Sequence, residues 1–273
     1  RRGDPRGGRR PGLGRVSAET ARVTATPDQP IDVSILVNTF EKPRHLALVL
    51  ESIALQRADC RLEVIVSDDG STDDTAAVVA GFAAHAALPV RFTSQPHDGF
   101  RLARVRNAAA RLARGGYLLF LDGDCVLPPH HVAAHLARRR RGTALLGFCA
   151  RLSRGTSELL VPENLPHTDL TALVPHAEHR ALARRWRKAW WHAALRHPTK
   201  PRLAGGDFGV WREDFTRVNG FDERFVGWGQ EDDVGRRRGA RGGAGGRGLS
   251  RRRRVTCASR CGRCACGAAA STS

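Results

Sequence analysis

The stretch YLLFLDGDC, residues 117–125, decides the fold class of this chain. Its large apolar residues are followed at once by Asp122, Gly123 and Asp124. A short apolar run that ends at turn residues is typical of a buried strand. Unpaired carboxylates are costly at the mouth of such a strand, and a divalent cation with oxygen ligands is a natural partner for them. Without a cation, their mutual repulsion would raise the pKa of one of the two. The stretch therefore predicts a buried strand that ends at a cation site.

Further apolar segments lie on both sides of this strand, and helical patterns separate them. The predicted strands are residues 32–37, 62–67, 89–94, 117–125 and 143–150. The predicted helices are residues 44–56, 76–87, 101–115 and 128–140, the last with two prolines in its first turn. This alternation predicts an α/β fold, in which a mostly parallel sheet is covered by helices on both faces.

Acidic residues follow two of these strands. Asp68 and Asp69 come after the strand at 62–67, as Asp122 and Asp124 do after the strand at 117–125. Because ligands of open α/β sheets bind beyond the carboxyl ends of the strands, both acid clusters are expected at one ligand-binding edge. The alternative for DDGSTDDT, residues 68–75, is a simple turn in which a polar side chain caps the next helix.

The charge of the chain is distributed unevenly. The 273 residues carry a formal net charge of +18. Residues 1–29 and 234–273 together hold 18 arginines and only three acidic residues, so residues 30–233 are almost neutral. We predict a disordered basic leader at 1–30, one globular domain at 31–235 and a disordered Arg/Gly/Cys-rich tail at 236–273. The alternative is a basic nucleic-acid-binding protein, whose binding would depend steeply on salt.

The cysteines favour a reducing compartment. Cys60, Cys125 and Cys149 are widely spaced within the globular part, which predicts free thiols. In the tail, Cys261 and Cys264 form a C-x-x-C pair with few apolar residues around it, so a disordered tail is favoured over a zinc knuckle. No stretch reaches the roughly 18 apolar residues of a membrane span. We predict a cytoplasmic location.

Several motifs carry a family resemblance. SILVNTFEKP, VIVSDDGSTDDT, GFRLARVRNAAA and YLLFLDGDC resemble the family 2 glycosyltransferases, nucleotide-sugar enzymes with the GT-A fold. Residues 205–233, GGDFGVWREDFTRVNGFDERFVGWGQEDD, are similar to the galactosyltransferase-type C-terminal segment found in many of them. The resemblance implies a nucleotide-sugar-binding half at 31–150 and an acceptor-binding half at 151–235. It also implies metal-dependent inverting transfer from a UDP-sugar to a glycan or glycolipid acceptor, in surface polysaccharide or lipopolysaccharide synthesis.

The same resemblance implies the residues of a donor site. Asp69, with Asp68 beside it, would hold the uracil or ribose, since a carboxylate accepts hydrogen bonds from both. Thr39 and Phe40 would line the base pocket. Arg106 would lie near the nucleotide, because a guanidinium suits phosphate oxygens.

Roles toward the metal and the ribose are implied for the Asp-x-Asp motif. Asp122 would face the ribose and Asp124 would bind Mn²⁺ or Mg²⁺. A cation that bridges the diphosphate oxygens neutralises the charge that develops on the leaving group.

The acceptor side is implied by the later motifs. Asp232 would be the catalytic base, with Glu231 as its partner or alternative, and Trp228 would present a flat face to a sugar ring. Gly206 and Asp207, within GGDF, would form a loop under the donor or acceptor sugar. Family members often carry Asn in place of Asp207, which leaves acceptor preference open. The alternative is that the acid run only starts a helix and favours its dipole.

Two features bear on partners and on the chain's end. The basic, tryptophan-bearing segment 179–197 predicts a helix that packs under the site or rests peripherally on an anionic membrane. No specific nucleic-acid partner is expected. After residue 233 the chain lacks the histidine that often completes the metal site in the resembling enzymes, and its composition favours neither helix nor core. We hypothesise a truncated or frame-shifted end, which leaves a non-catalytic, nucleotide-sugar-binding remnant as the alternative function.

Overall fold

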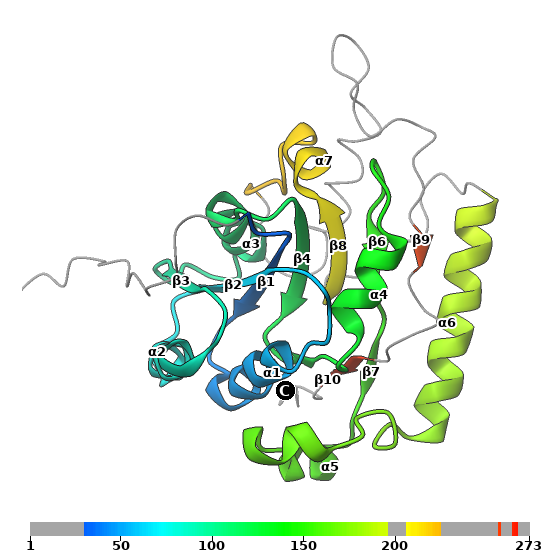
Figure 1. Ribbon diagram of the computed structural model, residues 1–273, viewed down its shortest axis with the longest axis horizontal. Helices are drawn as coiled ribbons and strands as arrows, with labels where there is room; N and C mark the ends of the chain where they lie inside the picture. The colour runs from blue at the N-terminus through cyan, green and yellow to red at the C-terminus, as the bar shows by residue number, and fades with distance from the viewer. Residues whose placement is uncertain (1–29, 196–205, 225–255, 258–263, 267–273) are drawn as a thin grey trace, which may run out of the picture.

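The computed structural model describes residues 30–195, 206–224, 256–257 and 264–266 (Figure 1). Its main feature is a seven-stranded sheet with the order β3-β2-β1-β4-β8-β6-β9. The strands of this sheet are β1 (Val33–Thr39), β2 (Leu62–Asp68), β3 (Val90–Ser94), β4 (Tyr117–Asp122), β6 (Leu145–Leu146), β8 (Asp207–Trp211) and β9 (Thr256–Cys257). The first four strands along the chain are parallel to one another, which confirms the predicted α/β fold.

Helices cover both faces of the sheet because its central strands are apolar on both sides. From β1, Val33, Ile35 and Val37 enter one core cluster, and Leu36 enters the other. The first cluster includes residues of α1 (Pro43–Ala54), α2 (Thr75–His85) and α4 (His131–Arg138). The second includes residues of α3 (Leu102–Leu112), with Phe215 of α7 (Arg212–Arg217) packed against it. In Figure 1, α1 and α2 lie across the sheet from α3 and α7.

The strand β8 runs antiparallel to β4, with Leu121 opposite Asp207 and Tyr117 opposite Trp211. The prediction of a loop at GGDF is therefore wrong for its last two residues, which open this strand. The paired residues of β4 and β8 are about 90 positions apart in the sequence, so the pairing leaves no local signal. The glycines before β8 favour a loop when only the sequence is considered.

The segment 143–150 is also not one strand. It forms β6 and then β7 (Cys149–Arg151), which belong to different sheets. The smaller sheet has the order β5-β10-β7, where β5 is Cys125–Val126 and β10 is Cys264–Cys266. Residues of β9 and β10 come from the tail for which disorder is predicted; here they pair through backbone groups, which does not require apolar side chains.

The remaining helices follow β7 along the chain. They are α5 (Arg154–Leu159), the 3₁₀ helix η1 (Pro162–His167) and α6 (His176–Ala194). Helix α6 contacts β7 and β9 and lies along one end of the sheet (Figure 1). Helix α4 starts at His131, so the two prolines predicted for its first turn precede it. Among the described residues, no helix has both the length and the apolar character needed to cross a membrane.

Candidate active site

The carboxyl ends of β1, β2 and β4 form one edge of the sheet, and the predicted acids lie along it. Asn38 is in register with Asp122 of β4, and Thr39 is in register with Asp68 of β2. The backbone N–H of Asp69 donates to the carbonyl of Thr39 at 3.0 Å. The two acid clusters are therefore brought together at the expected edge.

The side chain of Asp68 stabilises the turn that follows β2. Its carboxylate accepts hydrogen bonds from the backbone N–H groups of Gly70 and Ser71 and from the hydroxyls of Ser71 and Ser94. The residue is 2% exposed. Gly70 has φ +85, and a Cβ there would collide with the backbone of His97, so the turn requires glycine. Of the two readings of DDGSTDDT, Asp68 therefore fits the turn.

Asp69 lies beside the surfaces that suit a nucleoside. Its carboxylate accepts from Gln95 Nε2 at 2.6 Å and from the backbone N–H of Arg101 at 3.3 Å. The ring of His97 stacks on Phe40 with centroids 4.3 Å apart and an angle of 14° between the rings. Among the described residues, the buried Thr39 hydroxyl has no hydrogen-bond partner. Stacking faces, a carboxylate and an unused hydroxyl are the groups that recognise a base and a ribose.

Two side chains, those of Asn38 and Arg106, contact the carboxylate of Asp122. Asn38 Nδ2 donates to its carboxylate at 3.0 Å, and Arg106 lies 3.1 Å away in a salt bridge. Arg106 is 1% exposed and lies near the rings of Phe208 and Phe221. Burial raises the pKa of Asp122, and the opposing effects of Arg106 and Asn38 do not fully offset it. Arg106, predicted to lie near the nucleotide, thus contacts Asp122.

Asp124 is the second carboxylate of the motif, and it is partly buried. It accepts a salt bridge from Lys42 Nζ at 2.9 Å, and its side chain is 20% exposed. Ligand atoms of Asp122, Asp124 and Cys125 all lie within 4.8 Å of one another. The two carboxylates fit Mn²⁺ or Mg²⁺, which prefer oxygen ligands, and the thiol does not. The Lys42 ammonium balances Asp124 in the structure.

Gly206 adjoins this motif, and Asp207 lies below it. The carbonyl of Gly206 accepts from the backbone N–H of Asp122 at 3.1 Å, and a Cβ on Gly206 would come within 3.1 Å of the Asp122 carboxylate. Asp207 is 0% exposed, and its carboxylate bonds to His131 at 3.2 Å. Gly206 therefore lies against the Asp122 carboxylate, while the Asp207 side chain belongs to the interior.

The predicted acceptor residues Trp228, Glu231 and Asp232 lie outside the described residues. Their roles as sugar platform and catalytic base stay predictions.

Four polar residues of this edge were not predicted. They are Asn38, Lys42, Gln95 and His97, which lie at or just after the ends of β1 and β3, as the acids do for β2 and β4. The segments NTFEKP and QPHDGF carry this signal in the sequence, so the edge rule applied to every strand would have found them.

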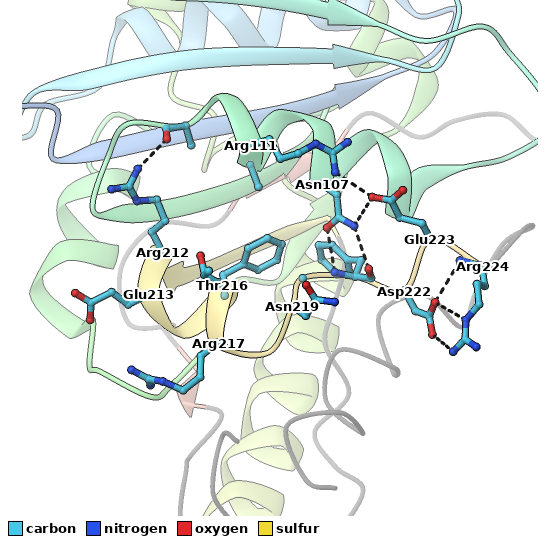
Figure 2. A pocket seen from close by; sticks show the side chains of 15 residues that line it. Asn107, Arg111, Arg212, Glu213, Thr216, Arg217, Asn219, Asp222, Glu223 and Arg224 are labelled. Atoms are coloured by element: carbon cyan, nitrogen blue, oxygen red, sulfur yellow. Dashed lines mark hydrogen bonds and ion pairs between the residues drawn. The ribbon is translucent and has the colours of Figure 1, made fainter. Parts of the chain in front are cut away.

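A hollow with a volume of about 1200 Å³ is lined by α3, α7 and residues 219–224 (Figure 2). Asn107 shapes its wall by pairing with the backbone of Phe221 in both directions and by donating to Glu223 at 2.9 Å. None of the edge acids after β2 and β4 lines it. The side chains that suit a nucleotide thus lie at the carboxyl edge of the sheet and not in this hollow.

Comparison with known proteins identifies the family of this chain. Residues 34–195 match the sequence profile described as Glycosyl transferase family 2, and residues 193–252 match the profile described as N-terminal domain of galactosyltransferase. Validoxylamine A glucosyltransferase of Streptomyces hygroscopicus subsp. limoneus is 32% identical over 82% of this chain and 51% of its own length. Hyaluronan synthase of Pasteurella multocida is 26% identical over 75% of this chain and 22% of its own length. The chain thus spans about half or less of these relatives.

A structural comparison shows the fold. The crystal structure of S. aureus TarS 1-349 in complex with UDP-GlcNAc superimposes with a TM-score of 0.57 at 17% identity, over 89% of this chain and 60% of that chain. Together with the sheet order and the edge geometry, this establishes a GT-A fold. The chain belongs to glycosyl transferase family 2.

Proposed function

We propose that this chain transfers a sugar from a UDP-sugar to a hydroxyl group of a glycan or glycolipid, by a metal-dependent inverting reaction. The observation that carries the proposal is the placement of Asp69, Asp122 and Asp124 on one sheet edge, beside the Phe40–His97 stack. Relatives named as a glucosyltransferase and a hyaluronan synthase support a sugar donor and a carbohydrate-type product.

The donor would lie along this edge. The base would stack against Phe40, with the Thr39 hydroxyl and the Asp69 carboxylate as hydrogen-bond partners. Asp122, kept in place by Arg106 and Asn38, would accept from the ribose. Gly206, which lies against the Asp122 carboxylate, would be close to the sugar.

Asp124, with Asp122 near it, would hold Mn²⁺ or Mg²⁺ when the donor binds. The bound cation would supply neutralisation of the diphosphate's charge. Lys42 would have to release Asp124 on metal binding, and it could then contact a phosphate oxygen, since it is 39% exposed. The acceptor hydroxyl would lose its proton to Asp232 or Glu231, as the sequence predicts.

A donor screen tests the proposal. UDP-glucose, UDP-galactose and their N-acetylamino forms would be incubated with the chain and Mn²⁺, with GDP-mannose as the mismatched nucleotide, and nucleotide release would be measured. Release from one UDP-sugar supports the proposal. Binding of UDP without release from any donor would favour the non-catalytic alternative, and no UDP binding at all would contradict both.

Helix α6 supports a peripheral contact with an anionic membrane. Trp190 and Trp191 are 48% and 57% exposed, and the exposed Arg187 and Lys188 precede them. Aromatic and basic side chains on one helix are the groups that bind a membrane interface. A glycolipid acceptor would be reached from such a position.

A further inference from the structure

A second group of metal-ligating side chains lies in the interior, apart from the Asp122–Asp124 pair. His131 and His135 are one turn apart on α4, and Asp207 is the first residue of β8. They are 3%, 1% and 0% exposed, respectively. Their ligand atoms all lie within 4.8 Å of one another. Nothing in the proposed donor chemistry uses the two histidines.

The distances within this group match ligands that share one metal. Asp207 Oδ1 lies 3.2 Å from His131 Nε2 and 3.6 Å from His135 Nε2. Ligands bound tetrahedrally to zinc at about 2.0–2.1 Å are spaced roughly 3.3 Å apart. The 3.2 Å spacing is also that of a direct hydrogen bond between His131 and Asp207. The 3.6 Å spacing to His135 is too long for a hydrogen bond, and it is close to the spacing of two ligands that share one cation.

The surroundings of His135 also suit a metal ligand. Within the described part of the chain, its Nε2 is a buried polar atom without a hydrogen-bond partner. Its other ring nitrogen, Nδ1, lies 3.4 Å from the hydroxyl of Tyr117. Histidine ligands commonly use one nitrogen for the metal and the other for such an outer partner. The imidazole is thus oriented with Nε2 toward Asp207.

The backbone next to the Asp207 carboxylate packs closely against it. Gly147 lies against Asp207, so that a Cβ at position 147 would collide with the carboxylate. The group is therefore confined by the α4 helix, the start of β8 and this glycine.

We propose that His131, His135 and Asp207 bind a Zn²⁺ ion, with a water molecule as the fourth ligand. Two imidazoles and one carboxylate suit zinc, whereas Mg²⁺ and Ca²⁺ prefer oxygen ligands alone. The ion would tie α4 to β8. Because Gly206 precedes Asp207 and its carbonyl accepts from the backbone N–H of Asp122, the ion would also stabilise one wall of the donor site.

Metal content of the full chain tests the site. The protein would be purified without added metal, dialysed against a weak chelator and measured by elemental analysis. We expect about one zinc per wild-type chain, and the same content in His130→Gln, a matched control at the exposed neighbouring histidine. The double variant His131→Gln/His135→Gln should lose the zinc. Asp124→Asn should keep it, which separates this site from the donor-edge cation.

Zinc in the tail is the competing explanation. The variant Cys261→Ser/Cys264→Ser should retain one zinc, and X-ray absorption should show nitrogen and oxygen neighbours at about 2.0–2.1 Å without sulfur at about 2.3 Å. Zinc that is absent from the wild type and does not raise its melting temperature when added would overturn the proposal, as would sulfur neighbours. If the histidine variant does not fold, the wild-type metal content and absorption spectrum still decide.

Discussion

The guanidinium of Arg106 lies 3.1 Å from the Asp122 carboxylate, with the arginine side chain 1% exposed and the aspartate side chain 34% exposed. Arg106 is therefore placed to position Asp122, the group that we propose faces the ligand. Removing only the arginine would leave a partly buried carboxylate without its cation.

Arg106→Leu should lower the free energy of unfolding by about 3 kcal/mol, the lower end for breaking a buried ion pair, because Asp122 keeps some contact with water. UDP affinity should fall with it. Denaturant unfolding and calorimetry measure the two effects. Arg104→Leu, on the exposed side of the same helix, is the matched control and should change stability by no more than about 0.5 kcal/mol. Equal effects of both substitutions would contradict the assigned role.

Phe40 should contribute to base recognition. Phe40→Ala should weaken UDP binding about ten-fold, since stacking of a base on an aromatic ring contributes about 1–3 kcal/mol. Inorganic pyrophosphate with Mn²⁺ has no base, so its affinity should be unchanged. A parallel loss for UDP and pyrophosphate would show that the substitution had damaged the edge as a whole.

The contacts of Glu63 predict that the free energy of unfolding of the protein falls in acid. The residue is 0% exposed, and its carboxylate accepts from Ser34 Oγ at 2.6 Å and forms salt bridges with Arg91 and Arg114. Burial raises the pKa of Glu63, but the hydrogen bonds from Ser34 and the Arg114 backbone and the contact with Arg91 outweigh it and bring the pKa below the ordinary value. The resulting stability is present above the unfolded pKa of about 4.5 and is lost as pH falls through the folded pKa.

Glu63→Gln should therefore be less stable than wild type at pH 7 and should show a smaller loss of stability on acidification below about pH 4.5. Thermal unfolding across pH measures this slope. Glu213→Gln changes an exposed carboxylate and should keep the wild-type slope. A wild-type slope in Glu63→Gln would refute the explanation.

The exposed tryptophans of α6 predict membrane binding. Trp190→Ala/Trp191→Ala should bind vesicles containing anionic phosphatidylserine several-fold more weakly than wild type, as measured by co-sedimentation. Neutral phosphatidylcholine vesicles should bind neither protein well, because the basic side chains of the helix need an anionic surface. If the wild-type protein bound neither type of vesicle, the proposed membrane contact would be excluded.

The sequence predicted the parallel half of the sheet because local apolar runs and helical spacing report those elements directly. It also placed Asp69, Asp122 and Asp124 correctly at one edge, since the direction of parallel strands determines where their ends meet. It did not predict the antiparallel strand β8, whose partners β4 and β6 are far away in sequence.

The sequence contains a signal for the two interior histidines. His131 and His135 have the i, i+4 spacing that places two side chains on one helix face. Their third partner, Asp207, comes from β8, so the group becomes visible only when the strand is placed. The pairing of Lys42 with Asp124 depends likewise on the β1 and β4 ends meeting in space.

Calorimetric titration of UDP in the presence and absence of Mn²⁺ tests the central claim most directly, that the edge carboxylates hold a cation-bound nucleotide. The wild type should bind UDP more tightly with Mn²⁺, and Asp124→Asn should lose this enhancement, together with about 100- to 1000-fold of any transfer rate. Asp98→Asn, which changes an exposed aspartate paired with Arg101, should behave as wild type. UDP binding that is equally strong in Asp124→Asn, with the same response to Mn²⁺, would contradict the account.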